Sequence, residues 1–305
     1  MRLFAVLCIL LASYPLTSGA GERSKLGYGR LITNDLIGDR KDRWRTGSVA
    51  SSWVWGPEWQ GQAPDRFGQL IEFRFNAEVI APESLTFSAP GDRPFVGALS
   101  FGLHTHYQTR AVEVAVGGDL VIVGPQTRLD DVQAGLHDFF DGPKQASSVR
   151  STQIGNDVHP TGVIELGRTL YLSDSVSLRP FVEARAGVET LARVGADLSF
   201  GGVGQGALLI RDPVTGHRYR AIQNDVPGFS LTVGGDVAYV DHSEYLPSDR
   251  GLVVENARSR LRGGVHWQGH SGHRAFYGLT WLGREFEAQR KSGQIVGSVR
   301  LQINF

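Results

Sequence analysis

A glutamine and a histidine stand four residues apart in the segment DDVQAGLHDFFDGPK, which covers residues 130–144. Residues four apart share one face of a helix, so Gln133 and His137 are expected to point the same way. A helix is predicted here because four apolar residues recur at helical spacing: Leu129, Val132, Leu136 and Phe140. An imidazole held in this way can act as a general base, and a neighbouring amide can position a water molecule.

Other polar residues suited to such chemistry fall in separate segments. Asn34 and Asp35 are adjacent, Thr46 lies in the run DRWRTG, and Arg93 lies in GDRPF. An arginine can bind a phosphate or a sugar oxygen. No G-x-S-x-G segment occurs, which favours water activated by a histidine over a serine nucleophile. Several carboxylates also fall in these segments and in the segment after the predicted helix, including Asp35, Asp141 and Asp157.

The start of the chain and its composition indicate a secreted protein. The first twenty residues, MRLFAVLCILLASYPLTSGA, have a basic start, an apolar run and a small-x-small end, which predicts a signal peptide over residues 1–20. Cys8, the only cysteine, lies inside that run, so the remainder has neither a disulfide framework nor a cysteine metal site. The 31 basic and 31 acidic residues give no electrostatic case for nucleic acid.

Most of the chain after residue 20 alternates apolar and polar residues, as strands do. In the segment 71–79 the odd positions are Ile, Phe, Phe, Ala and Val, whereas the even positions are Glu, Arg, Asn and Glu. No run of about 20 apolar residues occurs, so no membrane-spanning helix is expected. Dense charged faces, aromatic residues at segment ends and a last strand ending in Phe305 favour an outer-membrane barrel with a charged lumen over a periplasmic sandwich.

The predicted fold class is all-β: a transmembrane antiparallel β-barrel of about twelve strands, with residues 21–305 as one domain. Segments 37–45, 81–93 and 124–160 become extracellular loops, and the third and longest contains the helix. Residues 201–225 are long for a periplasmic turn, so they are either such a turn or a hairpin that alters the count. The predicted strands are 27–36, 46–56, 68–80, 94–107, 110–123, 161–172, 176–188, 190–200, 226–240, 251–267, 273–284 and 292–305.

This topology gathers the polar residues of the three loops at one rim of the barrel. Asn34 and Asp35 are neighbours on a strand, so their side chains point to opposite faces and one of them faces away from the lumen. A site that acts on lipid needs groups on that outer side. His104 and His106 have the spacing of a metal-binding pair, but the strand count places them at the periplasmic end as lumen residues.

Four segments in order resemble the lipid A 3-O-deacylase family (LpxR-type): TNDLIGDRKDRWRTG, GDRPFVG, VGPQTRLDDVQAGLHDFF and the Pro-Lys that follows. The resemblance covers most of the chain after residue 20. It implies a twelve-stranded outer-membrane barrel that hydrolyses the 3′-acyloxyacyl ester of lipid A and depends on calcium. Lipid A or lipopolysaccharide would be the substrate, outer-membrane lipids would surround the protein, and we expect a monomer.

The same resemblance implies roles for the candidate residues. His137, Gln133, Asn34 and Asp35 would be catalytic, and Arg93 and Thr46 would bind substrate. Asp35 would be a calcium ligand, with Asp157 or Asp141 as a further acidic ligand. The chain departs from the family after the helix, because QASSVRSTQIGND lacks the usual tryptophan and has Asn-Asp where the family has Asn-Glu.

Three alternatives remain open at the level of sequence. An outer-membrane phospholipase would use a serine and a histidine, but its His-x-Ser-Asn-Gly-type segment is absent. A porin or adhesin without enzymatic activity has no need of a loop helix bearing His and Gln. A degenerate family member would fold without turning over lipid A.

Overall fold

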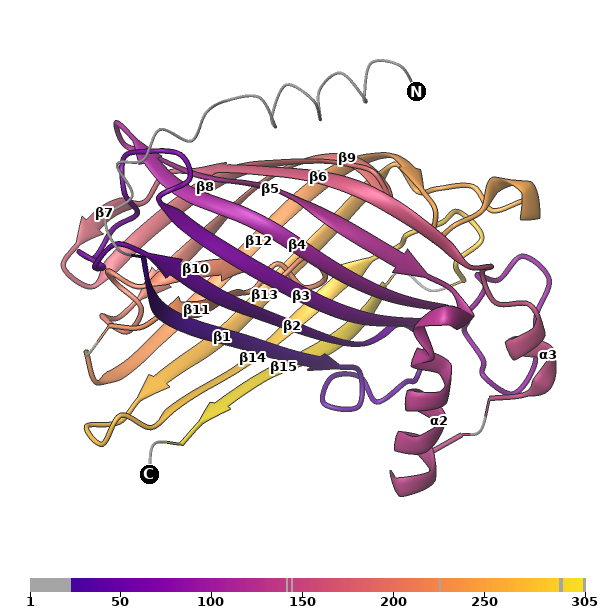
Figure 1. Cartoon of the computed structure of the whole chain (residues 1–305). Coiled ribbons are helices and arrows are strands. Elements are labelled where there is room, and N and C mark those ends of the chain that lie inside the picture. Colours follow the sequence, from indigo (N-terminus) through magenta and orange to yellow (C-terminus); the bar gives the residue numbers. More distant parts are fainter. Residues whose placement is uncertain (1–22, 141, 144, 225, 291–292, 304–305) are drawn as a thin grey trace, which may run out of the picture.

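The computed structural model describes residues 23–140, 142–143, 145–224, 226–290 and 293–303 (Figure 1). The predicted signal peptide, residues 1–20, and the candidate ligand Asp141 lie outside the described residues. None of the described helices is long and apolar enough to cross a membrane.

The described strands form a closed antiparallel barrel (Figure 1). Strands β1 and β15 pair with each other and so close the sheet. Strand β6 and the short strand β7 that follows it both pair with β8, so they are two pieces of one wall strand, and the wall consists of twelve strands. The wall consists of β1 (Ser24–Asn34), β2 (Trp44–Gly56), β3 (Leu70–Ala81), β4 (Val96–Thr109), β5 (Val112–Val123), β6 (Asp157–Gly167), β7 (Leu170–Ser173), β8 (Val176–Ala186), β9 (Glu189–Phe200), β12 (Gly228–Ser243), β13 (Ala257–Gln268), β14 (Arg274–Gly283) and β15 (Gly293–Gln302).

Each predicted strand overlaps one wall strand, and the predicted alternation is confirmed. On β3, Glu72 and Glu78 are buried in the lumen, whereas Leu103 on β4 and Leu261 on β13 are 64% and 60% exposed on the outside. Charged residues therefore line the lumen and apolar residues face the membrane. The two histidines of β4 are lumen residues as predicted, since His104 contacts Asp119 at 3.0 Å and His106 contacts Glu72 at 2.7 Å.

The segment 201–225 forms a hairpin of β10 (Leu208–Arg211) and β11 (Arg218–Ile222) that lies inside the barrel (Figure 1). Tyr219 is 1% exposed, and its hydroxyl lies 2.8 Å from Ser52 Oγ on the wall. Arg260 of β13 donates to Pro213 O in the hairpin turn at 2.8 Å. The hairpin therefore does not join the wall, and the strand count is unchanged.

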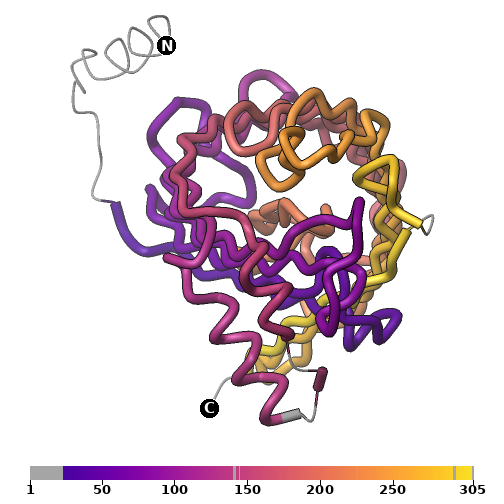
Figure 2. Tube along the Cα trace, turned by 90° about the vertical axis from the view of Figure 1, so that its right-hand side faces the viewer, coloured from indigo at the N-terminus to yellow at the C-terminus, as the bar shows by residue number. Residues whose placement is uncertain are grey.

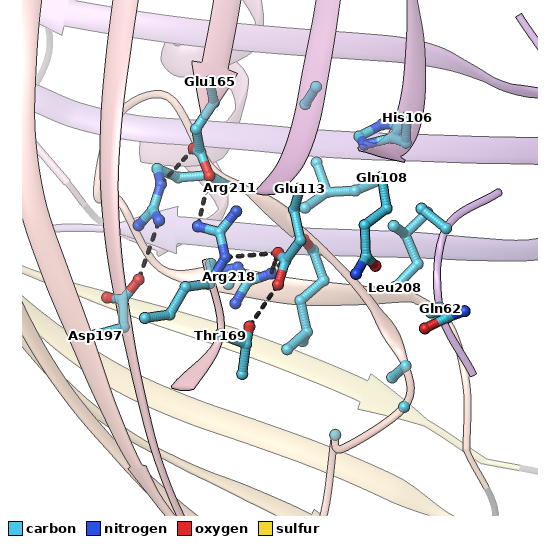
Figure 3. Close-up of a pocket in the computed structure, with 18 of the residues that line it drawn as sticks. Gln62, His106, Gln108, Glu113, Glu165, Thr169, Asp197, Leu208, Arg211 and Arg218 are labelled. Atoms are coloured by element: carbon cyan, nitrogen blue, oxygen red, sulfur yellow. Dashed lines mark hydrogen bonds and ion pairs between the residues drawn. The ribbon is translucent and has the colours of Figure 1, made fainter. Parts of the chain in front are cut away.

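A cavity of about 300 Å³ opens in the lumen beside this hairpin (Figure 3). Ion pairs and hydrogen bonds line part of its wall: Arg211 bridges Glu165 at 2.6 Å and Asp197 at 3.0 Å, and Thr169 donates a hydrogen bond to Glu113 at 2.5 Å. These charges compensate one another, as buried charges must. The cavity lies near the β4–β5 turn, away from the long loops at the other end of the barrel.

The long loops lie at the end of the barrel where β1 leads into β2, β3 into β4 and β5 into β6. The third loop carries the helical segments η1 (Pro125–Thr127), α2 (Leu129–Phe140) and α3 (Ser147–Ser151), and η2 (Ser248–Arg250) follows β12. Figure 2 shows α2 projecting beyond the ring of wall strands. The predicted loop helix is confirmed, whereas α3 was not predicted.

Candidate active site

The first loop is anchored by a bulge at the start of β2. The register of β2 against β3 shifts between Arg45 and Gly47, which leaves Thr46 as the extra residue. Such bulges re-aim a side chain next to a functional site. Here the backbone carbonyl of Thr46 accepts the N–H of Asp35 at 3.0 Å, so the bulge fixes the end of β1 against the start of β2.

Asp42 is the centre of the site, and three side chains converge on its carboxylate. Thr46 Oγ1 donates to Asp42 Oδ1 at 2.7 Å. Gln133 Nε2 donates to the same oxygen at 3.1 Å. His137 Nε2 lies 2.7 Å from Asp42 Oδ2. The predicted convergence of the first loop and the loop helix is therefore present, with an aspartate in the middle that the residue patterns did not single out.

The orientation of the His137 ring follows from its second nitrogen. His137 Nδ1 lies 2.7 Å from the carbonyl oxygen of Pro143. A carbonyl oxygen can only accept, so Nδ1 carries a proton and donates it. The 2.7 Å contact between Nε2 and the Asp42 carboxylate also needs a proton between its two atoms, so Nε2 can accept a proton only once water or substrate has displaced Asp42. Pro143 O therefore fixes Nδ1 as a protonated nitrogen, and Nε2 is the nitrogen left to exchange a proton with substrate or water.

Gln133 is held as a buried group of the site rather than a surface residue. The residue is 7% exposed, and its Nε2 donates a hydrogen bond to Asp42. Its Oε1 is buried without a protein hydrogen-bond partner. Buried amide oxygens are normally satisfied, so this atom is a candidate acceptor for a water or a substrate N–H or O–H group.

Asp35 is 3% exposed and lies close enough to Asp42 for the two acidic groups to interact electrostatically. Burial, together with the charges of Asp42 and Asp39, raises the pKa of Asp35 to about 8, although hydrogen bonds from Thr46 and the Arg43 N–H lower it. Its carboxylate oxygen accepts that N–H at 3.1 Å. The site thus brings two carboxylates together without an equal positive charge.

Backbone strain flanks Asp42 on both sides. Arg40 and Trp44 have φ values of 60° and 53°, in the left-handed region that non-glycine residues rarely adopt. Trp44 is 2% exposed, and the Arg43 guanidinium lies 4.1 Å from the centre of its ring. Strain of this kind gathers at active sites and persists when packing enforces it. The conformation of the loop is therefore set by the burial of Trp44.

Asn34 lies on the opposite face from Asp35, as the strand geometry predicts. Ile32, two residues earlier on its face, is 42% exposed to the outside, and Asn34 Oδ1 accepts the Leu36 N–H at 2.8 Å. Gly47 is its partner in the register, and a Cβ there would lie 3.2 Å from Asn34 Nδ2. Asn34 therefore shapes the start of the loop on the outer face.

Arg93 and Asp157 lie in other environments. Arg93 is 2% exposed, its Nη1 donates to Glu285, and Asp92 accepts only its backbone N–H, at 2.8 Å. The Asp157 side chain is 67% exposed and lies 3.6 Å from His159 Nε2. Neither of them contacts Asp42 or His137 in the described part of the chain. The structure thus places Asp42 with His137, while Asp157 lies elsewhere, beside His159.

The helix offers an apolar surface next to these polar groups. Val132 and Leu136 are 53% and 52% exposed, and Leu36 in the first loop is 57% exposed. By contrast Leu129 is buried at the start of the helix, close to Gly97. The helix is thus anchored at its first turn and exposes apolar side chains beyond it, as helices at a membrane interface do.

Two glycines permit the close contacts of the helix. A Cβ on Gly97 would lie 2.5 Å from Thr127 Oγ1 and 3.0 Å from Leu129 Cβ. A Cβ on Gly142 would lie 3.0 Å from His137 Cγ. Gly97 and the central Asp42 both lie in segments that the sequence singled out, since Gly97 ends the motif GDRPFVG and Asp42 opens DRWRTG. Their roles were missed because they depend on contacts between loops.

Comparison with known proteins supports the same fold. LpxR from Salmonella typhimurium has a similar structure with a TM-score of 0.72, at 17% sequence identity, over 90% of this chain and 98% of that one. Two porin structures are only remotely similar, each with a TM-score of 0.39: KdgM in complex with disordered oligogalacturonate, at 5% identity over 91% of this chain and 99% of that one, and NanC, at 6% identity over 91% and 100%.

No curated protein matches the sequence. The model of the family described as outer membrane protein LpxR matches residues 3–305. A match over nearly the whole chain shows the family as well as the cellular location. The chain therefore belongs to the family of outer membrane protein LpxR and lies in the bacterial outer membrane.

Proposed function

We propose that this protein is a lipid A deacylase that hydrolyses the 3′-acyloxyacyl ester, with His137 as the general base. The observation that carries the proposal is the 2.7 Å contact between His137 Nε2 and Asp42 at the rim of the barrel. Family membership and the motif resemblance supply the substrate class and the position of the ester. The exposed apolar face of α2 suits a substrate that carries acyl chains.

In the proposed reaction, a water molecule enters beside His137 Nε2 and gives its proton to that nitrogen. The oxygen of the water attacks the ester carbonyl, and the C–O bond to the sugar breaks. The proton on Nε2 then passes to the leaving sugar oxygen. The Asp42 carboxylate stabilises the imidazolium that forms, and Pro143 O keeps Nδ1 protonated throughout. Catalytic hydrogen bonds often rearrange when substrate binds, which allows water to enter beside Asp42.

Other residues would orient the reacting groups. Gln133 Oε1, buried without a protein partner, would accept a hydrogen bond from the water or from an amide of the substrate. Thr46 would hold the carboxylate of Asp42, and Asn34 would shape the outer wall of the site. Arg93 would act on substrate only if the Glu285 contact opened, so we assign it a lesser role than its motif implies.

A calcium ion fits the chemistry of this site. Asp35 and Asp42 supply carboxyl oxygens, the ligands that calcium prefers. Burial and the charges of Asp42 and Asp39 raise the pKa of Asp35, so a bound cation would favour its ionised form. Among the described residues, no three or more His, Cys, Asp or Glu side chains are arranged to hold a metal ion. Backbone or substrate oxygens would have to complete the set. When bound, the ion would supply positive charge for the carbonyl oxygen of the ester.

Expression in a Gram-negative host, followed by mass measurement of its lipid A, tests the proposal. Wild type should remove one 3′-acyloxyacyl unit, and a calcium chelator should suppress the loss in isolated membranes. His137→Ala should lower turnover by about 10²–10⁴-fold, the usual contribution of a general base. His242→Ala is the matched control, because its side chain is 53% exposed and contacts only Glu244 among the described residues. Unchanged lipid A, or loss of acyl chains from phospholipids alone, would refute the assignment.

A further inference from the structure

A balanced group of six charged residues fills the lumen just inside the rim. We call it the rim cluster, and it consists of Arg45, Arg93, Arg258, Glu78, Glu189 and Glu285. No side chain of the cluster is more than 13% exposed. Three positive and three negative charges are thus shielded from water and balance one another. Removing one member would leave an uncompensated buried charge.

Arg45 is the centre of the rim cluster. Its Nη1 lies 2.6 Å from Glu78 on β3, its Nε 2.8 Å from Glu285 in the β14–β15 loop, and its Nη2 3.4 Å from Glu189 on β9. A planar guanidinium can hold three carboxylates in fixed directions, which a lysine cannot. The backbone of Arg45 is held as well, because its N–H donates to Gln294 Oε1 on β15 at 2.9 Å.

The bulge at Thr46 joins the rim cluster to the candidate active site. Arg45 precedes the bulge and directs its side chain into the lumen, whereas Thr46 directs its hydroxyl to Asp42 at 2.7 Å. The Thr46 carbonyl accepts the Asp35 N–H at 3.0 Å. A single peptide bond therefore links a guanidinium fixed on three sides to the residue that holds both acids of the site.

We propose that Arg45 is a positioning residue: by anchoring the bulge from inside the barrel, it holds Thr46, and through Thr46 the Asp42–His137 pair, on the outer rim. The inference rests on the proposed function for its catalytic consequence. Arg45 itself touches none of the groups proposed to react, so it acts on how often the site is correctly assembled rather than on substrate binding.

A purely structural role for the rim cluster would have a different consequence. Arg179 on β8 provides the comparison, because it lies 2.7 Å from Glu113 and 2.7 Å from Glu165 and is buried to a similar degree. Its pairs line the cavity at the other end of the lumen. If buried ion pairs only stabilise the barrel, Arg45 and Arg179 variants should impair activity alike.

The experiment compares Arg45→Ala and Arg45→Lys with Arg179→Ala and Arg179→Lys in the full-length barrel. Folded yield is measured first, by the gel shift of unheated barrels. Deacylation by equal amounts of folded protein should show kcat reduced at least tenfold for Arg45→Ala and less for Arg45→Lys, with KM within twofold. The Arg179 variants should keep kcat within twofold. Wild-type kcat in folded Arg45→Ala, or an equal loss in Arg179→Ala, would overturn the proposal.

Hydrogen exchange tests the same inference without activity. The Asp35 N–H is protected by Thr46 O, and the Arg43 N–H by the Asp35 carboxylate. In Arg45→Ala the peptide covering residues 35–46 should exchange at least fivefold faster than in wild type, while the wall strands exchange at the wild-type rate. In the Arg179 variants the peptide 35–46 should exchange at the wild-type rate. Unaltered exchange in this peptide would contradict the positioning role. If wild type shows no deacylase activity, but Arg45→Ala still speeds exchange in residues 35–46, the proposed function is refuted and the positioning role of Arg45 stands.

Discussion

Gly142 lies against the imidazole of His137, so that a Cβ at residue 142 would be 3.0 Å from Cγ and 3.1 Å from Cδ2 of the ring. These separations are shorter than ordinary carbon contacts, so a methyl group there must push the ring. The ring is held on its other sides by Pro143 O and Asp42, each at 2.7 Å. Glycine at this position is thus a requirement of the His137 geometry.

Gly142→Ala should therefore lower kcat for deacylation by about tenfold or more, since misplacing a catalytic group by a fraction of an ångström is costly. Gly135→Ala, inside helix α2, is the control, because a Cβ there meets nothing within 4 Å. The control should be neutral or slightly stabilising. Equal activity of the two folded variants would show that the ring position does not matter.

Asp42→Asn keeps the shape of the side chain but removes the charge that stabilises an imidazolium at His137. We expect a loss of activity of about 10- to 100-fold, the range seen when a partner that orients a catalytic group is removed. Asp131→Asn, on the exposed side of the helix, should have no comparable effect. Initial rates on purified lipid A measure both, and full activity of Asp42→Asn would exclude the proposed pair.

Leu136→Gln tests whether the exposed face of α2 contacts acyl chains. Leu136 is 52% exposed beside His137, so a polar side chain should weaken contact with the membrane interface. Activity on lipid A in vesicles should fall several-fold, and activity on detergent-dispersed lipid A should fall less. Leu172→Gln, at a position 62% exposed near the β7–β8 turn at the opposite end of the wall, is the control. A uniform loss on both substrates would count against membrane contact.

The rim cluster should make stability depend on acid. Burial by itself raises the pKa of Glu285, but the charges of Arg45, Arg93 and Arg258 outweigh it and hold this pKa at about 2, below the ordinary 4.5. A carboxyl with a depressed pKa contributes stability above its unfolded pKa and loses it as pH falls toward the folded pKa. The Tm difference between wild type and Glu285→Gln should thus be widest above about pH 5 and shrink below about pH 4. A constant difference from pH 3 to 7 would contradict this.

The barrel should not conduct ions as a porin does. The β10–β11 hairpin packs on lumen residues of the wall, including Leu31, Val54 and Phe276, in one buried cluster. Ion pairs between opposite charges line the cavity beside it, including those of Arg211 with Glu165 and Asp197. Planar bilayers containing the protein should show no steps of the size of an open porin, which serves as the positive control. Steps of that size from pure protein would revive the porin alternative.

The barrel, its strands and the loop helix could be predicted from the sequence because each has a local signal. The alternation of apolar and polar residues in 71–79 reflects the lipid on one face of the strand and the polar lumen on the other. This pattern can be read from the segment alone, without any distant residue. The helix likewise follows from the 3.6-residue spacing between Leu129 and Phe140. The pairing of His137 with Gln133 needed only that same helix geometry.

Tertiary structure decided which residues meet across the loops. Asp42 and His137 are brought together by a bulge at Thr46, left-handed backbone at Arg40 and Trp44, and a helix seated on Gly97. None of these has a periodic signal, since loop conformation is set by packing between distant segments. For the same reason Arg93 pairs with Glu285 and the 201–225 hairpin turns into the lumen. Local periodicity determined the wall and the helix, and long-range burial and charge pairing decided the site.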